Sequence, residues 1–143
     1  MKRFIPVLLL LASLLLASCA SPAPSALVNV PKIDNQGAVT VTVTPLNLDK
    51  PGEILDFDVS MSTHSVELGM DLTTLSTLTT DTGVSISPSQ WDGPVGGHHV
   101  EGTLSFPATK DGKSILEGAK NLTLTITGVD NATRTLTWDL SAK

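Results

Sequence analysis

Residues 121–140 read NLTLTITGVDNATRTLTWDL, and this stretch decides the fold class. Leucine and isoleucine alternate with threonine over 121–127, and leucine and tryptophan alternate with polar residues over 135–140. Such alternation is typical of a β-strand that buries one face only, and threonine fits the exposed face of a strand. The glycine, aspartate and asparagine between the two segments favour a turn. The stretch therefore predicts two strands separated by a turn.

The same two-residue period recurs along the chain from residue 38 onward. The segments that show it most clearly are AVTVTVT at 38–44, ILDFDVSM at 54–61 and HSVELGMDL at 64–72. Only KSILEGAK at 113–120 is expected to form a helical turn. Seven or eight short strands with turns between them predict an all-β domain over 38–143, an antiparallel immunoglobulin-like β-sandwich. A small closed barrel is the alternative.

The first twenty residues, MKRFIPVLLLLASLLLASCA, have the layout of a secretory signal. Their apolar run is shorter than the roughly 20 residues that a membrane-spanning helix needs. The motif LASC at 16–19 resembles the lipobox of bacterial lipoproteins. The resemblance implies that residues 1–18 are a lipoprotein signal peptide and that the thiol of Cys19 carries a diacylglycerol, with palmitate as an expected acyl chain. An ordinary signal peptide with a chance cysteine is the alternative.

The residues after the cysteine bear on where the protein is anchored. An aspartate next to the cysteine resembles an inner-membrane retention signal, and this chain has Ala20 and Ser21 instead. The resemblance thus implies the outer membrane in a two-membrane bacterium, and the outer face of the cell membrane in a one-membrane bacterium. Residues 19–37 are rich in proline, serine and alanine, which predicts a flexible tether. Its later part, 27–33, is able to lie on the domain as an edge segment.

The charge of the chain is acidic and excludes some partners. Loss of residues 1–18 would remove two of the nine basic side chains and none of the fourteen acidic ones, so the formal charge of −5 would become −7. A nucleic-acid-binding protein needs a basic patch, so no nucleic-acid partner is expected. The single cysteine leaves no partner for a disulfide, and the core must hold the domain together.

The three histidines are the first candidates for a site. His98 and His99 follow two glycines in WDGPVGGHHVEGTLSF at 91–106. Neighbouring residues of a strand point to opposite faces, so these two rings converge only if the glycines keep this corner out of the sheet. We expect His64 and His98 each at the start of a strand and on its buried side. Two such positions can meet at one end of a sandwich.

A metal site is one interpretation of these histidines. The candidate ligands are His64, His98, His99 and Asp92, with Met61 and Met70 as soft ligands. Histidine with methionine favours copper, and histidine with carboxylate favours zinc. The alternative is structural, because histidine at a strand end can hydrogen-bond to loop backbone. In that interpretation His64 fixes the loop at 91–97 and Trp91 covers the core.

Two of these segments also resemble a family of domains. THSVELGMDL at 63–72 and WDGPVGGHHVEGTLSFP at 91–107 are similar to uncharacterised bacterial exported domains, over roughly residues 53–140. Those domains pair a Thr-His-Ser strand start with Trp-Asp-Gly, Gly-His-His and Gly-x-Leu-x-Phe. The resemblance implies that His64, Trp91, His98 and His99 form one unit, and it implies no activity.

The sequence gives little support to an enzyme. It contains no GxSxG, no GxGxxG and no phosphate-binding loop, and Asp56 and Asp58 fit an exposed strand face. We therefore expect no catalytic residues and no cofactor, with copper or zinc as the alternative. The expected function is a non-enzymatic binding or structural module, anchored to the membrane by lipid, whose partner is an unidentified envelope protein or ligand. A third hypothesis is a strand edge that extends a partner's sheet.

Overall fold

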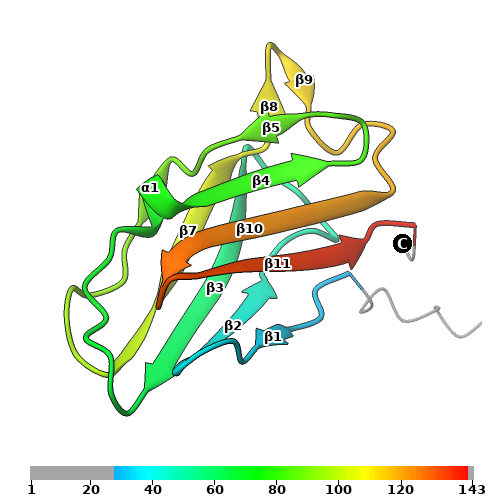
Figure 1. The fold of residues 1–143 in the computed structure, drawn as a ribbon. Helices are drawn as coiled ribbons and strands as arrows, with labels where there is room; N and C mark the ends of the chain where they lie inside the picture. The colour runs from blue at the N-terminus through cyan, green and yellow to red at the C-terminus, as the bar shows by residue number, and fades with distance from the viewer. Residues whose placement is uncertain (1–27, 142–143) are drawn as a thin grey trace, which may run out of the picture.

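The computed structural model describes residues 28–141, which form two antiparallel sheets packed face to face (Figure 1). The predicted signal peptide at 1–18, the lipidation site Cys19 and the first part of the tether lie outside the described residues. Within 28–141, no helix is long and apolar enough to cross a membrane. The predicted all-β sandwich is confirmed.

The first sheet has five strands, and every neighbouring pair in it is antiparallel. In spatial order these strands are β1 (Lys32–Asp34), β2 (Val39–Pro45), β3 (Ile54–Thr63), β7 (His99–Pro107) and β6 (Gln90–Trp91). The alternation predicted at 38–44 and 54–61 is present in β2 and β3, where valine, leucine, phenylalanine and methionine face inward. Threonine, serine and aspartate occupy the outer face of these two strands.

The second sheet has four strands and is also antiparallel. In spatial order they are β11 (Ala132–Asp139), β10 (Asn121–Val129), β4 (Ser76–Thr80) and β5 (Ser85–Ile86). A separate hairpin of β8 (Thr109–Lys110) and β9 (Lys113–Ser114) projects at the top of Figure 1. The two strands predicted within residues 121–140 are thus β10 and β11, which pair with each other through the turn at 130–131.

The strand order is that of an immunoglobulin-like sandwich. Such domains place strands A, B, E and D in one sheet and G, F, C and C′ in the other. Here β2-β3-β7-β6 has the order A-B-E-D, and β11-β10-β4-β5 has the order G-F-C-C′. β1 is an additional strand beside A. The finer prediction, an immunoglobulin-like sandwich rather than a closed barrel, therefore agrees with this topology.

Aromatic side chains join the two sheets at the centre of the core. The ring of Phe57 on β3 lies 5.6 Å from Phe106 on β7 and 5.6 Å from Trp138 on β11. All three side chains are buried. Because Phe57 and Trp138 come from opposite sheets, their contact shows that the inward faces predicted from the two-residue period do meet.

The strand predicted at 64–72 is wrong. β3 ends at Thr63, whose buried hydroxyl accepts hydrogen bonds from the backbone N–H groups of Ser65 and Val66 at 3.2 and 3.3 Å. Such local bonds compete with the pairing of a strand and turn the chain into a loop. The loop leads to the four-residue helix α1 (Leu72–Leu75), which Asp71 caps by accepting from Thr73 N–H.

Two further boundaries differ from prediction. Residues 113–120 form strand β9 and a series of turns rather than a helical turn, and Gly118 adopts a positive φ of 71°. The domain also begins by Val28 and not at residue 38. Val28 is fully buried, and the segment after it forms β1 on the edge of the first sheet. The part of the predicted tether before Val28 lies outside the described residues, and the packing from Val28 onward agrees with the expected edge segment at 27–33.

Candidate binding surface at the loop end

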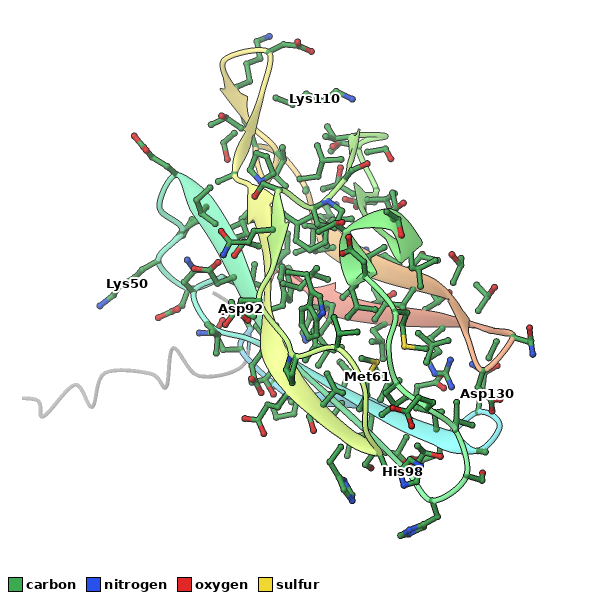
Figure 2. All side chains as sticks on the ribbon, turned by 90° about the vertical axis from the view of Figure 1, so that its left-hand side faces the viewer. Lys50, Met61, Asp92, His98, Lys110 and Asp130 are labelled. Atoms are coloured by element: carbon green, nitrogen blue, oxygen red, sulfur yellow. The ribbon has the colours of Figure 1, made fainter. Side chains whose placement is uncertain are left out.

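Three connections lie together at one end of the sandwich, which we call the loop end: residues 64–75, 92–98 and 130–131. The register places Ser62 opposite His99, so the loop after β3 and the loop before β7 are neighbours. Asp130 accepts from the Ala38 N–H, which precedes the start of β2 at the same end. Figure 2 shows His98 and Asp130 in the lower half of the view and Lys110 at the opposite end.

Backbone hydrogen bonds brace two of these loops against each other. Leu68 N–H donates to the Gly97 carbonyl at 2.9 Å, and Gly96 N–H donates to the Leu68 carbonyl at 2.8 Å. The side chain of Glu67 accepts from Gly97 N–H at 2.6 Å. Gly96 and Gly97 have φ values of 98° and 94°, which side chains with a Cβ rarely adopt. The two glycines therefore allow the tight return that presents Val95, 83% exposed, at the tip.

The histidines are exposed at this end, and the prediction that His64 and His98 lie on buried strand faces is wrong. His64 follows the last residue of β3, and His98 precedes the first residue of β7, so neither belongs to a strand. His98 Nε2 lies 4.0 Å from Glu67 Oε2. An exposed pair of this kind contributes little to stability. His99 opens β7 and is also exposed.

The candidate metal ligands are spread over different environments. Among residues 28–141, no three histidine, cysteine, aspartate or glutamate side chains are grouped so that they could hold one ion. Met61 is 1% exposed in the core, on the inner face of β3, whereas Met70 is half-buried in the loop. The soft ligand Met61 is thus packed among apolar side chains, while the three histidines are exposed.

Asp92 has a structural contact that explains its position. Its carboxylate accepts from the backbone N–H of Thr103, and its own N–H donates to the Thr103 carbonyl at 3.3 Å. At this crossing Gly93 lies against Gly102, and a Cβ on Gly102 would meet the backbone of Gly93. A Cβ on Gly93 would in turn collide with the ring of Trp91, which packs against the core. The WDG motif therefore closes the edge of the first sheet.

Asp56 and Asp58 occupy the outer, half-buried face of β3, as the alternation predicts. Asp56 accepts from the hydroxyl of Ser105 on β7 at 2.6 Å. Its own N–H donates to the side-chain oxygen of Asn47 at 3.1 Å. These contacts link neighbouring strands across the outer face.

Sequence reasoning missed Arg134, the buried charge of the domain. It lies on β11 between the sheets, and its guanidinium donates to the carbonyls of Val129, Gln36 and Val39 at 2.5, 2.7 and 3.1 Å. Its Nε makes no hydrogen bond but forms an ion pair with Asp34 Oδ1 at 3.3 Å. The sequence does contain a signal for this burial, because residue 134 shares the inward parity of Leu136 and Trp138.

The segment that begins the domain is held by these contacts. Burial acts to raise the pKa of Asp34, but hydrogen bonds from Gln36 and the charge of Arg134 outweigh it, and the pKa is lowered. Trp138 Nε1 donates to the Val30 carbonyl at 2.7 Å. Asn29 donates to Asp49 and accepts from Leu48 N–H, in the connection between β2 and β3. The described chain thus starts beside the 46–53 connection.

The loop end and the start of the domain lie at opposite ends of β3. This strand begins at Ile54, next to the 46–53 connection, and ends at Thr63, next to His64. Its 10 residues span about 33 Å at ~3.3 Å per residue. The loops at 64–75 and 92–98 therefore point away from the end where the described chain starts.

No family model matches the sequence, and no curated protein matches it. Among solved structures, the chain is similar to a DUF4426 family protein from Pseudomonas aeruginosa. The TM-score is 0.46 at 10% sequence identity, and the likeness covers 76% of this chain and 93% of that chain.

Proposed function

We propose that the protein is an exported lipoprotein whose immunoglobulin-like domain is a non-enzymatic binding module at the cell envelope. In this proposal Cys19 carries the lipid, and the domain is held at the outer membrane of a two-membrane bacterium or on the outer face of the cell membrane of a one-membrane bacterium. The ligand is an envelope protein that docks on the loop end.

One observation carries the proposal: the separation of the chain start from the loop end. The described chain starts beside the 46–53 connection, and the braced loops lie across the length of β3. A domain anchored through residue 19 would hold these loops toward its surroundings. Their mutual hydrogen bonds also favour binding, because a loop that is already ordered loses less entropy when it binds a partner.

The anchor is tested by the intact mass of the full-length protein purified from membranes. We expect loss of residues 1–18 and an added mass of a diacylglyceryl group with a further acyl chain. The control Cys19→Ala should yield no lipid-modified form and should leave the membrane fraction. A protein that lacks residues 1–18 but carries no lipid would contradict the anchor.

The binding surface is tested by photo-crosslinking in cells that express the full-length protein. A photoreactive residue at position 95, on the tip of the loop end, should give a discrete adduct with one partner. The same residue at position 135, on the exposed outer face of β11, is the matched control and should not. Equal adducts from both positions, or an adduct from position 135 alone, would contradict the loop end as the interface.

A further inference from the structure

Large apolar side chains are exposed at few places among residues 28–141. Val95 lies at the tip of the loop end. The others are Val30, Ile33, Leu46 and Ile54, which are 38%, 61%, 51% and 39% exposed. We call these four residues the apolar patch. Single exposed apolar residues are ordinary on a protein surface, but a group of them on one surface marks an interaction site.

Hydrogen bonds bring Leu46 and Ile54 of the patch together. Leu46 N–H donates to the Asp56 carbonyl, and the Asn47 side chain donates to the Ile54 carbonyl, so the two ends of the β2–β3 connection face each other. Ile33 on β1 lies opposite Thr42 on β2. Ile33, Leu46 and Ile54 have the parity of the outward-facing residues of the first sheet.

Leu46 of the patch lies in the connection beside which the described chain starts. Asn29 bonds to Asp49 and Leu48 in the same connection that carries Leu46. Val28 follows Cys19 by nine residues in the sequence, which is at most about 30 Å of extended chain. A lipid on Cys19 would therefore keep the patch within reach of the bilayer, with Val95 on the far side of the domain.

We propose that the apolar patch docks on the membrane that holds the lipid anchor, with Leu46 and Ile54 entering the interfacial layer. This inference rests on the proposed lipidation of Cys19. Membrane affinity of an interfacial surface grows with the apolar area that it buries. The anchor makes docking an intramolecular event at an effective concentration in the ~mM range, so a small patch is sufficient.

Charge contributes little to this contact. Lys50 lies between Asp49 and Glu53 in the connection, so positive and negative groups face the lipid together. Docking should therefore depend weakly on the fraction of anionic lipid and on salt. The consequence for function is orientation: the docked domain holds the loop end away from the bilayer instead of tumbling on its tether.

The experiment uses the full-length protein, purified from membranes and reconstituted in vesicles of phosphatidylethanolamine and phosphatidylglycerol. Lys50→Cys beside the patch and Val95→Cys on the loop end are each labelled with an environment-sensitive fluorophore. Lipids that carry a spin label near the headgroup then quench the fluorophore if it is close to the bilayer. We expect quenching several-fold stronger at position 50 than at position 95. Equal quenching at both positions would overturn the docking.

Variants test whether the apolar side chains cause the contact. Leu46→Ser combined with Ile54→Ser should reduce quenching at position 50 to the level of position 95. Ile33→Ser, at the most exposed position of the patch, gives a second variant with little effect on packing. Val95→Ser is the matched control and should leave quenching at position 50 unchanged. Quenching that survives both patch variants would overturn the docking.

Flotation of the same samples separates this inference from the anchor. Protein that floats with the vesicles but shows equal quenching at both positions retains its anchor and lacks docking. Protein that does not float overturns the anchor and the docking with it. A fluorescence change at position 50 that needs no vesicles and rises with protein concentration would assign the patch to a second copy of the chain, and would also overturn the docking.

Discussion

At the scale of single residues, Arg134 ties the start of the domain to its last strand. Its guanidinium reaches three carbonyl groups and Asp34, and its side chain is completely buried. A buried charge is tolerated only when it is paired and hydrogen-bonded. The three carbonyls belong to β2, to the turn before it and to β10, so one side chain fixes the relative position of three segments.

We predict that Arg134→Leu lowers the free energy of unfolding by about 3–5 kcal/mol, because it leaves buried carbonyls and the Asp34 carboxylate without their partner. The measurement is urea unfolding of a soluble form that starts at Ala20. Thr135→Leu, the neighbouring residue on the exposed face of β11, is the matched control and should change stability by less than about 0.5 kcal/mol. Equal losses in the two variants would show that Arg134 is not a structural centre.

At the scale of elements, the sequence predicts strands well where side chains alternate without interruption. β2, β3, β10 and β11 all bury the side chains that their two-residue period assigns to the core. The segment at 64–72 has a similar alternation, but polar side chains decide its structure. The Thr63 hydroxyl and the Asp71 carboxylate bind nearby N–H groups and replace strand pairing with local bonds. A prediction from the hydrophobic period alone takes no account of such hydrogen bonds.

The same limit explains the outcome at the candidate site. The prediction groups His98, His99 and the WDG motif because they are close in the sequence. The structure places these residues in one connection and the strands that it joins. The inward parity predicted for Val100, Leu104 and Phe106 is present in β7, but His98 precedes the first residue of the strand and is exposed in the loop. The partner of His98, Glu67, lies 31 positions away and comes near through the brace between loops.

The turn between β4 and β5 provides a pH-dependent link to β10. Asp81 accepts from the backbone N–H groups of Asn121 and Lys120 at 3.2 and 3.0 Å. These bonds, chiefly that from Asn121, lower the pKa of Asp81 below its ordinary value of 3.8. The unfolded chain therefore takes up this proton first as the pH falls. The stability that the carboxylate contributes is complete above the unfolded pKa and is lost as the pH falls through the lower, folded pKa.

We predict that the melting temperature falls as the pH is lowered from about 5 to about 2, and that Asp81→Asn makes this fall shallower. An asparagine oxygen can still accept both hydrogen bonds, but it does not titrate in this range. The measurement is thermal unfolding at a series of pH values. Asp111→Asn, in the exposed turn of the β8–β9 hairpin, is the control and should follow the wild-type curve. An unchanged slope in Asp81→Asn would contradict the assignment.

At the scale of the whole molecule, the placement of the chain start decides which loops the domain can present to a partner. The strand order A-B-E-D and G-F-C-C′ sets the 64–75, 92–98 and 130–131 connections at one end. Burial of Val28 and the bonds of Asn29 set the first described residues at the other. The composition of residues 28–37 predicts a tether and not their packing, because part of that packing depends on Arg134 and Trp138, about a hundred residues away.

We predict that residues 28–37 are part of the folding unit. Two soluble chains, one starting at Val28 and one at Ala38, are compared by urea unfolding followed by tryptophan fluorescence. The shorter chain loses the buried Val28 side chain, the carbonyl that accepts from Trp138 Nε1, and Asp34 beside Arg134. Since a buried polar group left unpaired costs about 1–3 kcal/mol, we expect a large drop in the unfolding midpoint or a failure to fold. A chain starting at Ala20 should match the one starting at Val28, whereas equal midpoints for starts at 28 and 38 would restore the boundary expected from composition and would free those residues to act as tether.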